Sequence, residues 1–260
     1  MFTWPARQVS TTFGGSHMNG WELVENGSYV DAIGVFTEQL QTRPSTLDFN
    51  NRGMAYLHLG NYDAALADFR SAEAVSSATL QTVCDGSMCG VASWMAAREQ
   101  EALDTWLAGV DASLAGLVRY GDAAGGVTVG NLLFFAGVRM SDKNAVAAAT
   151  RLLRKRLRTK QSIAWPGPTS RHLLGQASET EMLAAVSDVA FLRERQLCQA
   201  RFYAGVRALT PREPAAYLEA MREAYEFGRV TKLEPEYYLA AHEARTYTRA
   251  EQGAAADGGA

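Results

Sequence analysis

The stretch that comes closest to a catalytic motif is Gly86-Ser-Met-Cys-Gly90, which places one thiol, Cys89, among small residues. A cysteine near a helix N-terminus is acidified by the helix dipole, and Asp85 is suited to cap such a helix. The stretch has no base beside the thiol, and its serine does not occupy the nucleophile position of a Gly-x-Ser-x-Gly motif. We therefore expect Cys89 to be a small buried residue. An enzyme that uses the loop from Cys84 to Gly90 is the alternative.

Histidine is the other residue type that often does chemistry, and the chain has four, far apart in sequence: His17, His58, His172 and His242. None has a metal-binding side chain three or four residues after it, and the sequence contains no HExxH motif. We therefore predict no catalytic residues, no metal and no cofactor. A site assembled from residues distant in sequence stays open as an alternative.

The composition is typical of a folded, nearly all-helical protein. The chain has 260 residues, of which 47% are hydrophobic, and a formal net charge of −3. Nucleic-acid binders carry a marked basic excess, so we predict no nucleic-acid partner. The three cysteines, Cys84, Cys89 and Cys198, form no CxxC pair, which is typical of reduced thiols in a cytoplasm. No apolar run reaches the length of a membrane span, so we predict a cytoplasmic protein without a membrane partner.

The elements that must position any site are clearest in residues 46–77, which have the pattern of two antiparallel helices joined by a turn. Small and aromatic residues follow the spacing of helix contacts: Gly53, Tyr56, Gly60, Tyr62, Ala65, Phe69 and Ala72. The same types recur at an offset of 33 residues: Gly20, Gly27, Tyr29, Ala32 and Phe36. Identities at one fixed offset indicate a repeat.

These two copies resemble the tetratricopeptide repeat (TPR) family. The small residues that the family pattern requires are Gly53, Ala65 and Ala72, and the aromatic ones are Tyr56, Tyr62 and Phe69. The upstream copy ends near Pro44, as the family does, but Leu23 and Gln39 depart from the pattern. The resemblance implies an all-α, TPR-like α-solenoid of about five to six helix-turn-helix pairs. It also implies a non-enzymatic scaffold for protein or peptide partners.

We predict one superhelical domain over residues 19–250, with clear repeats at 19–45 and 46–77 and degenerate pairs beyond them. In the third pair, 90–97 with 98–113, the contact spacing of the clear repeats is kept by Ala102, Trp106 and Gly109. Further pairs are expected at 132–140 with 145–160, at 170–176 with 178–188, and at 191–208 with 211–229. Two capping-box patterns, Ser178-x-x-Glu181 and Thr210-x-x-Glu213, mark helix starts.

The remaining segments are a connector, a last helix and a tail. The glycine-rich loop 121–130 lacks the Gly-Lys-Ser/Thr ending of a phosphate-binding loop, which favours a connector. A last helix is expected from Pro235, and residues 195–245 resemble the ends of bacterial NlpI-like repeat adaptors, although the chain shows no lipidation signal. Residues 251–260 have the composition of a disordered tail.

The first 18 residues differ from the rest, because Gly15-Ser-His-Met18 has the sequence of a tag-cleavage scar. One hypothesis is that residues 2–13 are a partner's peptide fused in front of its receptor, which would raise its effective concentration. Its ligand side chains would be Phe2, Trp4, Pro5, Arg7, Val9 and Phe13. A vector-derived or natural disordered leader is the alternative.

The resemblance also assigns a candidate groove, because the first helix of each pair lines the concave side of such a solenoid. Its lining residues would be Trp21, Leu47, Asn50, Asn51, Met54, Leu57, His58, Val91, Trp94, Met95, Phe134 and Phe202. Asparagine amides suit the backbone of an extended ligand, and the apolar side chains suit its apolar residues. The alternative is that Trp21, Met54 and Trp94 belong to the core.

A second candidate surface is the basic cluster around Arg151, Lys155 and Arg158, which share one helix face. An acidic partner would suit this face, and so would solvent. The leading hypothesis is an adaptor that binds a short extended peptide in its groove. The alternative is an inhibitor, immunity or chaperone-type protein that docks on a partner's folded surface, for which the basic cluster would matter more.

Overall fold

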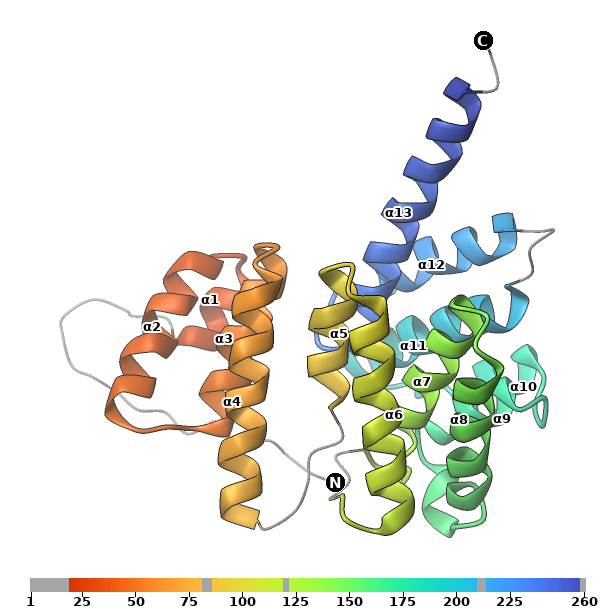
Figure 1. The fold of residues 1–260 in the computed structure, drawn as a ribbon, viewed down its shortest axis with the longest axis horizontal. Helices are drawn as coiled ribbons and strands as arrows, with labels where there is room; N and C mark the ends of the chain where they lie inside the picture. Colours follow the sequence, from red (N-terminus) through yellow and green to blue (C-terminus); the bar gives the residue numbers. More distant parts are fainter. Residues whose placement is uncertain (1–18, 81–85, 119–121, 210–213, 258–260) are drawn as a thin grey trace. The chain divides into compact units, whose positions relative to one another are not determined.

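The computed structural model describes residues 19–80, 86–118, 122–209 and 214–257, with the backbone alone for 78–80, 214 and 247–257. Within these ranges the chain is helical, without β-strands, and successive helices pack in adjacent pairs (Figure 1). This confirms the all-α prediction. The hypothesised ligand segment 2–13, the scar-like Gly15–Met18, Cys84, Asp85 and the Thr210 capping box lie outside the described residues.

The chain consists of two compact units, Met1–Ala72 and Glu73–Ala260, and each is described by itself. Unit 1 contains α1 (Gly20–Glu25), α2 (Tyr29–Thr42), α3 (Thr46–His58) and the first part of α4 (Tyr62–Leu80). Asn19 caps α1 in a complete capping box with Glu22, and the Ser45 hydroxyl accepts from the Asp48 N–H at the start of α3.

Glycines set how closely the helices of unit 1 approach each other. A Cβ atom on Gly20 would lie 2.6 Å from the Phe36 ring, and one on Gly53 would lie 2.7 Å from the Phe69 ring. Both rings are buried, as are Ala32, Ala65 and Ala72. The two copies therefore pack an aromatic ring of the second helix onto a bare backbone of the first, as the repeat pattern predicts.

The turns of the two copies also match. Gly27 and Gly60 have φ of 80° and 73°, the left-handed conformation that glycine adopts without cost. In each turn this glycine N–H bonds three residues back, to Val24 in one copy and to Leu57 in the other. The next N–H then bonds five residues back, so each first helix ends in a Schellman motif.

Unit 2 holds the remaining helices. They are α5 (Ser87–Met95), α6 (Glu99–Ala115), α7 (Thr128–Arg139), α8 (Lys143–Arg156), a 3₁₀ turn η1 (Lys160–Ile163), α9 (Gly167–Leu173), α10 (Glu179–Ala184), α11 (Ala190–Ala208), α12 (Pro214–Gly228) and α13 (Pro235–Asp257). The pairs α5 with α6, α7 with α8, and α11 with α12 pack side by side (Figure 1). The chain's last helix, α13, also packs against α5, the first helix of this unit.

The first pair of unit 2 has the same glycine-to-aromatic spacing as the two pairs that begin with α1 and α3. The buried Trp106 indole packs on Gly90, sixteen residues before it, as Phe36 packs on Gly20 and Phe69 on Gly53. Ala97 takes the turn position of Gly27 and Gly60, with the same hydrogen bonds and a φ of 58°. The third helix pair is therefore present as α5 and α6, with Ala102, Trp106 and Gly109 buried, and alanine stands at its turn position.

Two details of unit 2 concern helix ends. Ser178 and Glu181 form the predicted capping box at the start of α10. The helix α13 runs to Asp257, and so includes residues 251–257 that the composition predicts to be disordered. Residues 254–256 are all alanine, the amino acid with the highest helix propensity, which favours the continuation of α13.

Candidate protein-binding face

The predicted groove residues of unit 1 lie on one face of α3. At 3.6 residues per turn, Leu47, Asn50, Asn51, Met54 and His58 fall on the same side of the helix, and all five are half-buried. We call this set the α3 face. Leu57, also predicted to line the groove, is only 3% exposed and belongs to the core, because it lies on the side of α3 that carries Gly53.

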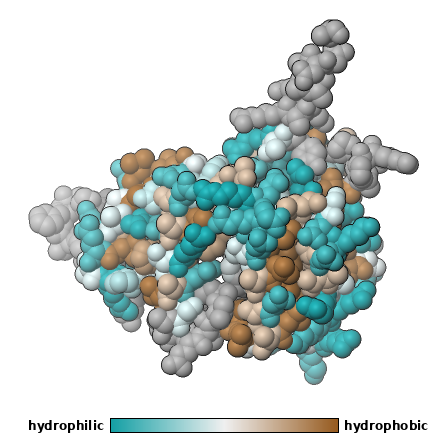
Figure 2. Space-filling model, in the orientation of Figure 1, coloured by the Kyte–Doolittle hydropathy of each residue, from teal (hydrophilic) through white to brown (hydrophobic). Residues whose placement is uncertain are grey.

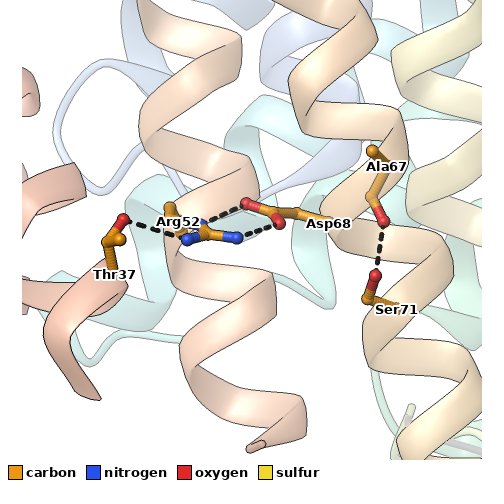
Figure 3. A network of polar contacts seen from close by, with 5 residues as sticks. All are labelled: Thr37, Arg52, Ala67, Asp68 and Ser71. Carbon is orange, nitrogen blue, oxygen red and sulfur yellow. Dashed lines mark hydrogen bonds and ion pairs between the residues drawn. The ribbon is translucent and has the colours of Figure 1, made fainter. Parts of the chain in front are cut away.

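The opposite side of α3 is anchored by Arg52, whose guanidinium lies between α2 and α4 (Figure 3). Its Nε and one terminal nitrogen donate to the two carboxylate oxygens of Asp68 at 2.8 and 2.7 Å, and its other terminal nitrogen donates to the Thr37 hydroxyl at 2.9 Å. The side chain of Asp68 is 6% exposed. The hydrogen bond to this carboxylate raises the pKa of Arg52. One side chain therefore ties α2, α3 and α4 together and fixes which way the α3 face points.

The α3 face contains two amides that the described chain leaves unused. The side chains of Asn50 and Asn51 form no hydrogen bond in the part of the chain that the structure describes. Each amide offers two N–H donors and a carbonyl acceptor. Unpaired, half-buried amides beside Leu47 and Met54 combine polar and apolar contacts on one face, which suits the backbone and side chains of another polypeptide.

Trp21 of α1 and His58 of the α3 face are both held in place. The Trp21 ring packs against the core of Leu23 and Phe36, and its N–H donates to Glu25 at 2.8 Å. The His58 ring stacks on Tyr29, with ring centroids 4.4 Å apart and an interplanar angle of 11°. Both rings therefore have restricted orientations, which lowers the entropy lost when they contact a ligand.

In unit 2 the groove prediction must be corrected. Trp94, Val91 and Phe202 are fully buried and Met95 is 5% exposed. The Phe135 ring packs on the rings of Trp94 and Phe202, with centroid-to-centroid distances of 4.8 and 5.0 Å. Only Phe134 of the predicted set in this unit is half-buried. These rings form the core because α13 returns to pack on α5 and α11.

Sequence reasoning missed the polar interior of unit 2, which is organised by carboxylates of α13. Glu243 is 1% exposed and accepts hydrogen bonds from three helices: Trp94 Nε1 of α5 at 2.9 Å, Arg139 Nε of α7 at 2.6 Å and the Tyr217 hydroxyl of α12 at 2.9 Å. Each donor satisfies the buried charge and joins another helix to α13.

Glu236 lies two turns earlier on the same face of α13 and is also 1% exposed. It accepts from the Tyr203 hydroxyl at 2.6 Å and from Gln199 at 3.2 Å, both on α11. Unlike Glu243, it has no basic partner among the described residues, and the nearby Glu234 pairs with Arg195. Burial, with the charge of Glu234 as a smaller cause, raises the pKa of Glu236 to about 7.

The two thiols that the structure describes, Cys89 and Cys198, are both buried. Cys89 is 4% exposed inside α5, as expected, and Cys198 is fully buried in α11. Burial and the charges of Glu236 and Glu234 raise the pKa of Cys198 well above its ordinary value, which makes this thiol inert. In the described part of the chain no group of three or more histidine, cysteine or acidic side chains is placed to hold a metal ion.

Comparisons with known proteins found no relative of this chain, either among family models or among curated proteins. No family model matches this chain. No curated protein is significantly similar to it. Across the described residues, no helix is both long and apolar enough to cross a membrane.

Proposed function

We propose that this chain is a non-enzymatic, TPR-like scaffold whose unit 1 binds a short extended segment of a partner protein across the α3 face. The observation that supports the proposal best is the pair of half-buried amides, Asn50 and Asn51, that make no hydrogen bond in the described chain. An extended ligand brings unpaired backbone N–H and C=O groups, and these amides would satisfy them.

The likeness to repeat scaffolds is supported by packing. Three helix pairs place an aromatic ring on a glycine sixteen residues earlier, and each first helix ends in the same turn geometry. Repeats of this kind leave one face of their first helices for ligands. The face in unit 1 carries Leu47 and Met54 but no lysine or arginine, which favours a ligand with apolar or aromatic side chains over a free carboxylate.

The proposal is tested by selecting random peptides from a phage-displayed library on the full chain and measuring their dissociation constants by fluorescence anisotropy. The double variant Asn50→Ala/Asn51→Ala should weaken binding about tenfold, because two hydrogen bonds are lost. The matched control, Gln39→Ala/Gln41→Ala, removes two exposed amides from α2 and should bind within about twofold of wild type.

Two outcomes would contradict the proposal. One is that no peptide is enriched over selection on an unrelated helical protein. The other is that the two double variants bind the selected peptides equally well. Circular dichroism of both variants establishes that a change in binding does not come from unfolding.

A further inference from the structure

The exposed face of α8 carries a stripe of cations. Arg151, Arg154 and Lys155 lie within about 100° of one another around the axis of α8, and these three residues and Arg158 are all exposed. Arg158 lies just beyond the last residue of α8. We call these four residues the α8 stripe. No aspartate or glutamate occurs between Lys143 and Ala177, although the whole chain has a net charge of −3.

Most of this positive charge is not neutralised within the molecule. Arg154 and Arg158 form no ion pair or hydrogen bond in the described residues. Arg151 lies 3.5 Å from Asp111, but both side chains are more than 60% exposed, so the pair contributes little. Lys155 donates to a carbonyl rather than to a carboxylate.

The stripe is held on a rigid support. The opposite face of α8 buries Ala149, Leu152 and Leu153 completely. Lys155 Nζ donates to the Leu114 carbonyl and Arg156 to the Ser113 carbonyl, each at 2.9 Å, at the C-terminal end of α6. Cations suit that end of a helix because the macrodipole is negative there. The bonds fix α8 against α6, so the free cations keep a constant spacing.

We propose that the α8 stripe binds a polypeptide segment whose carboxylates repeat at helical spacing. Positions i, i+3, i+4 and i+7 on α8 span about 10 Å, and a facing helix with acidic residues at the same intervals would match them. Arginine is suited to this role, since its fork of donors pairs with both oxygens of a carboxylate. The inference concerns unit 2 and does not rest on the α3 face.

Two other polyanions suit the stripe less well. Surfaces that bind single-stranded nucleic acids combine cations with aromatic platforms, but residues 143–164 contain no aromatic residue. A helix that lies in a membrane inserts its apolar face, and the apolar face of α8 is buried in the core of unit 2. In the 3₁₀ turn that follows α8, Ile163 is 77% exposed and offers an apolar contact that a protein partner would use.

The test uses the full chain and three kinds of probe, with binding measured by fluorescence anisotropy or vesicle sedimentation. The first is a labelled synthetic helical peptide with glutamates at i, i+4 and i+7, compared with a scrambled peptide of the same composition. The others are a short DNA duplex and phosphatidylserine vesicles. Arg154→Glu/Arg158→Glu reverses two charges that form no ion pair or hydrogen bond with any residue whose placement is described. The control Arg193→Glu/Arg222→Glu makes the same charge change at exposed sites elsewhere in unit 2.

The proposal predicts that the ordered peptide binds at least about fivefold more tightly than the scrambled one, and that Arg154→Glu/Arg158→Glu weakens it about tenfold or more. The control variant should stay within about twofold of wild type. Equal binding of the two peptides, equal loss in the two variants, or no peptide binding would overturn it. Tighter binding of DNA or vesicles that depends on Arg154 and Arg158 would also overturn it.

Discussion

The ring of Phe69 lies 2.7 Å from the position that a Cβ atom on Gly53 would take. The ring is 1% exposed and packs between α3 and α4, so it cannot move away without opening the core of unit 1. The same relationship joins Gly20 to Phe36 and Gly90 to Trp106, always sixteen residues apart. Three helix pairs share this contact: α1 with α2, α3 with α4, and α5 with α6.

Gly53→Ala is therefore expected to destabilise the protein by about 1–3 kcal/mol, the usual cost of overpacking. The matched control is Gly34→Ala in α2, where an added Cβ would meet nothing within 4 Å. That change should stabilise by roughly 1 kcal/mol, because alanine favours helix. Urea denaturation of both variants, followed by circular dichroism, measures the difference. Equal shifts of the two midpoints would show that the contact with Phe69 is not tight.

The turn of the third helix pair allows the opposite substitution, from alanine to glycine. Ala97 has a φ of 58° where the clear repeats have Gly27 and Gly60, and a left-handed conformation costs an alanine about 1 kcal/mol. Ala97→Gly should stabilise the protein by about that amount, whereas Ala96→Gly, where φ is −81°, should not stabilise it. Thermal denaturation compares the two. A lower melting temperature for Ala97→Gly would contradict the geometry.

Arg52 should contribute more to the free energy of unfolding than an ordinary surface arginine, because its partner Asp68 is nearly buried. Arg52→Met leaves that carboxylate unpaired and should cost about 3 kcal/mol. Adding Asp68→Asn should recover part of the loss, since no buried charge then remains. A double-mutant cycle measured by urea denaturation gives the coupling. If the single variant loses no more than Arg43→Met, an exposed arginine of the same unit, the network in Figure 3 has no role in stability.

Glu236 predicts a pH dependence. Its pKa is about 7 in the folded protein, above the ordinary 4.5, so the folded state binds more protons than the unfolded state between these values. Its contribution to stability is fully present below about pH 4.5 and is lost as the pH rises through about 7. The loss amounts to about 3 kcal/mol.

Glu236→Gln should remove this dependence, so that the variant gains about 3 kcal/mol relative to wild type between pH 5 and pH 8. Only the difference between variant and wild type matters, because burial also lowers the pKa of His172 and His242, which adds a pH dependence of their own to both proteins. Denaturation at a series of pH values measures this difference. Parallel curves for the two proteins would contradict the assignment.

The helix pairs could be predicted from sequence because their contacts are local and repeat. The contact between Gly53 and Phe69 is indicated by the identical spacing of Gly20 and Phe36. Gly90 and Trp106 have the same spacing in a less regular helix pair. The same register predicted the candidate face of unit 1. It failed in unit 2, where Trp94 contacts Glu243, 149 residues away in the chain. The register shared by the helix pairs does not indicate that α13 packs against α5.

One signal for that return was present in the sequence. Glu236, Leu239, Ala240 and Glu243 follow the i, i+3, i+4, i+7 spacing of a buried helix face, and all four are buried. Two glutamates on an otherwise apolar stripe indicate carboxylates that need partners inside the protein. The partners themselves, Tyr203, Tyr217 and Arg139, come from three different helices and become evident only in three dimensions.

Peptide binding across the α3 face is tested most directly by finding where a selected peptide lies when it is bound. A photo-reactive phenylalanine derivative in place of Met54 puts the probe on the α3 face, and the same group in place of Gln39 puts it on the exposed side of α2. We predict that illumination links the peptide to position 54 and not to position 39, and that Asn50→Ala/Asn51→Ala lowers the yield of the link at a peptide concentration below the dissociation constant. A bound peptide that links to position 39, or to neither position, would contradict the account.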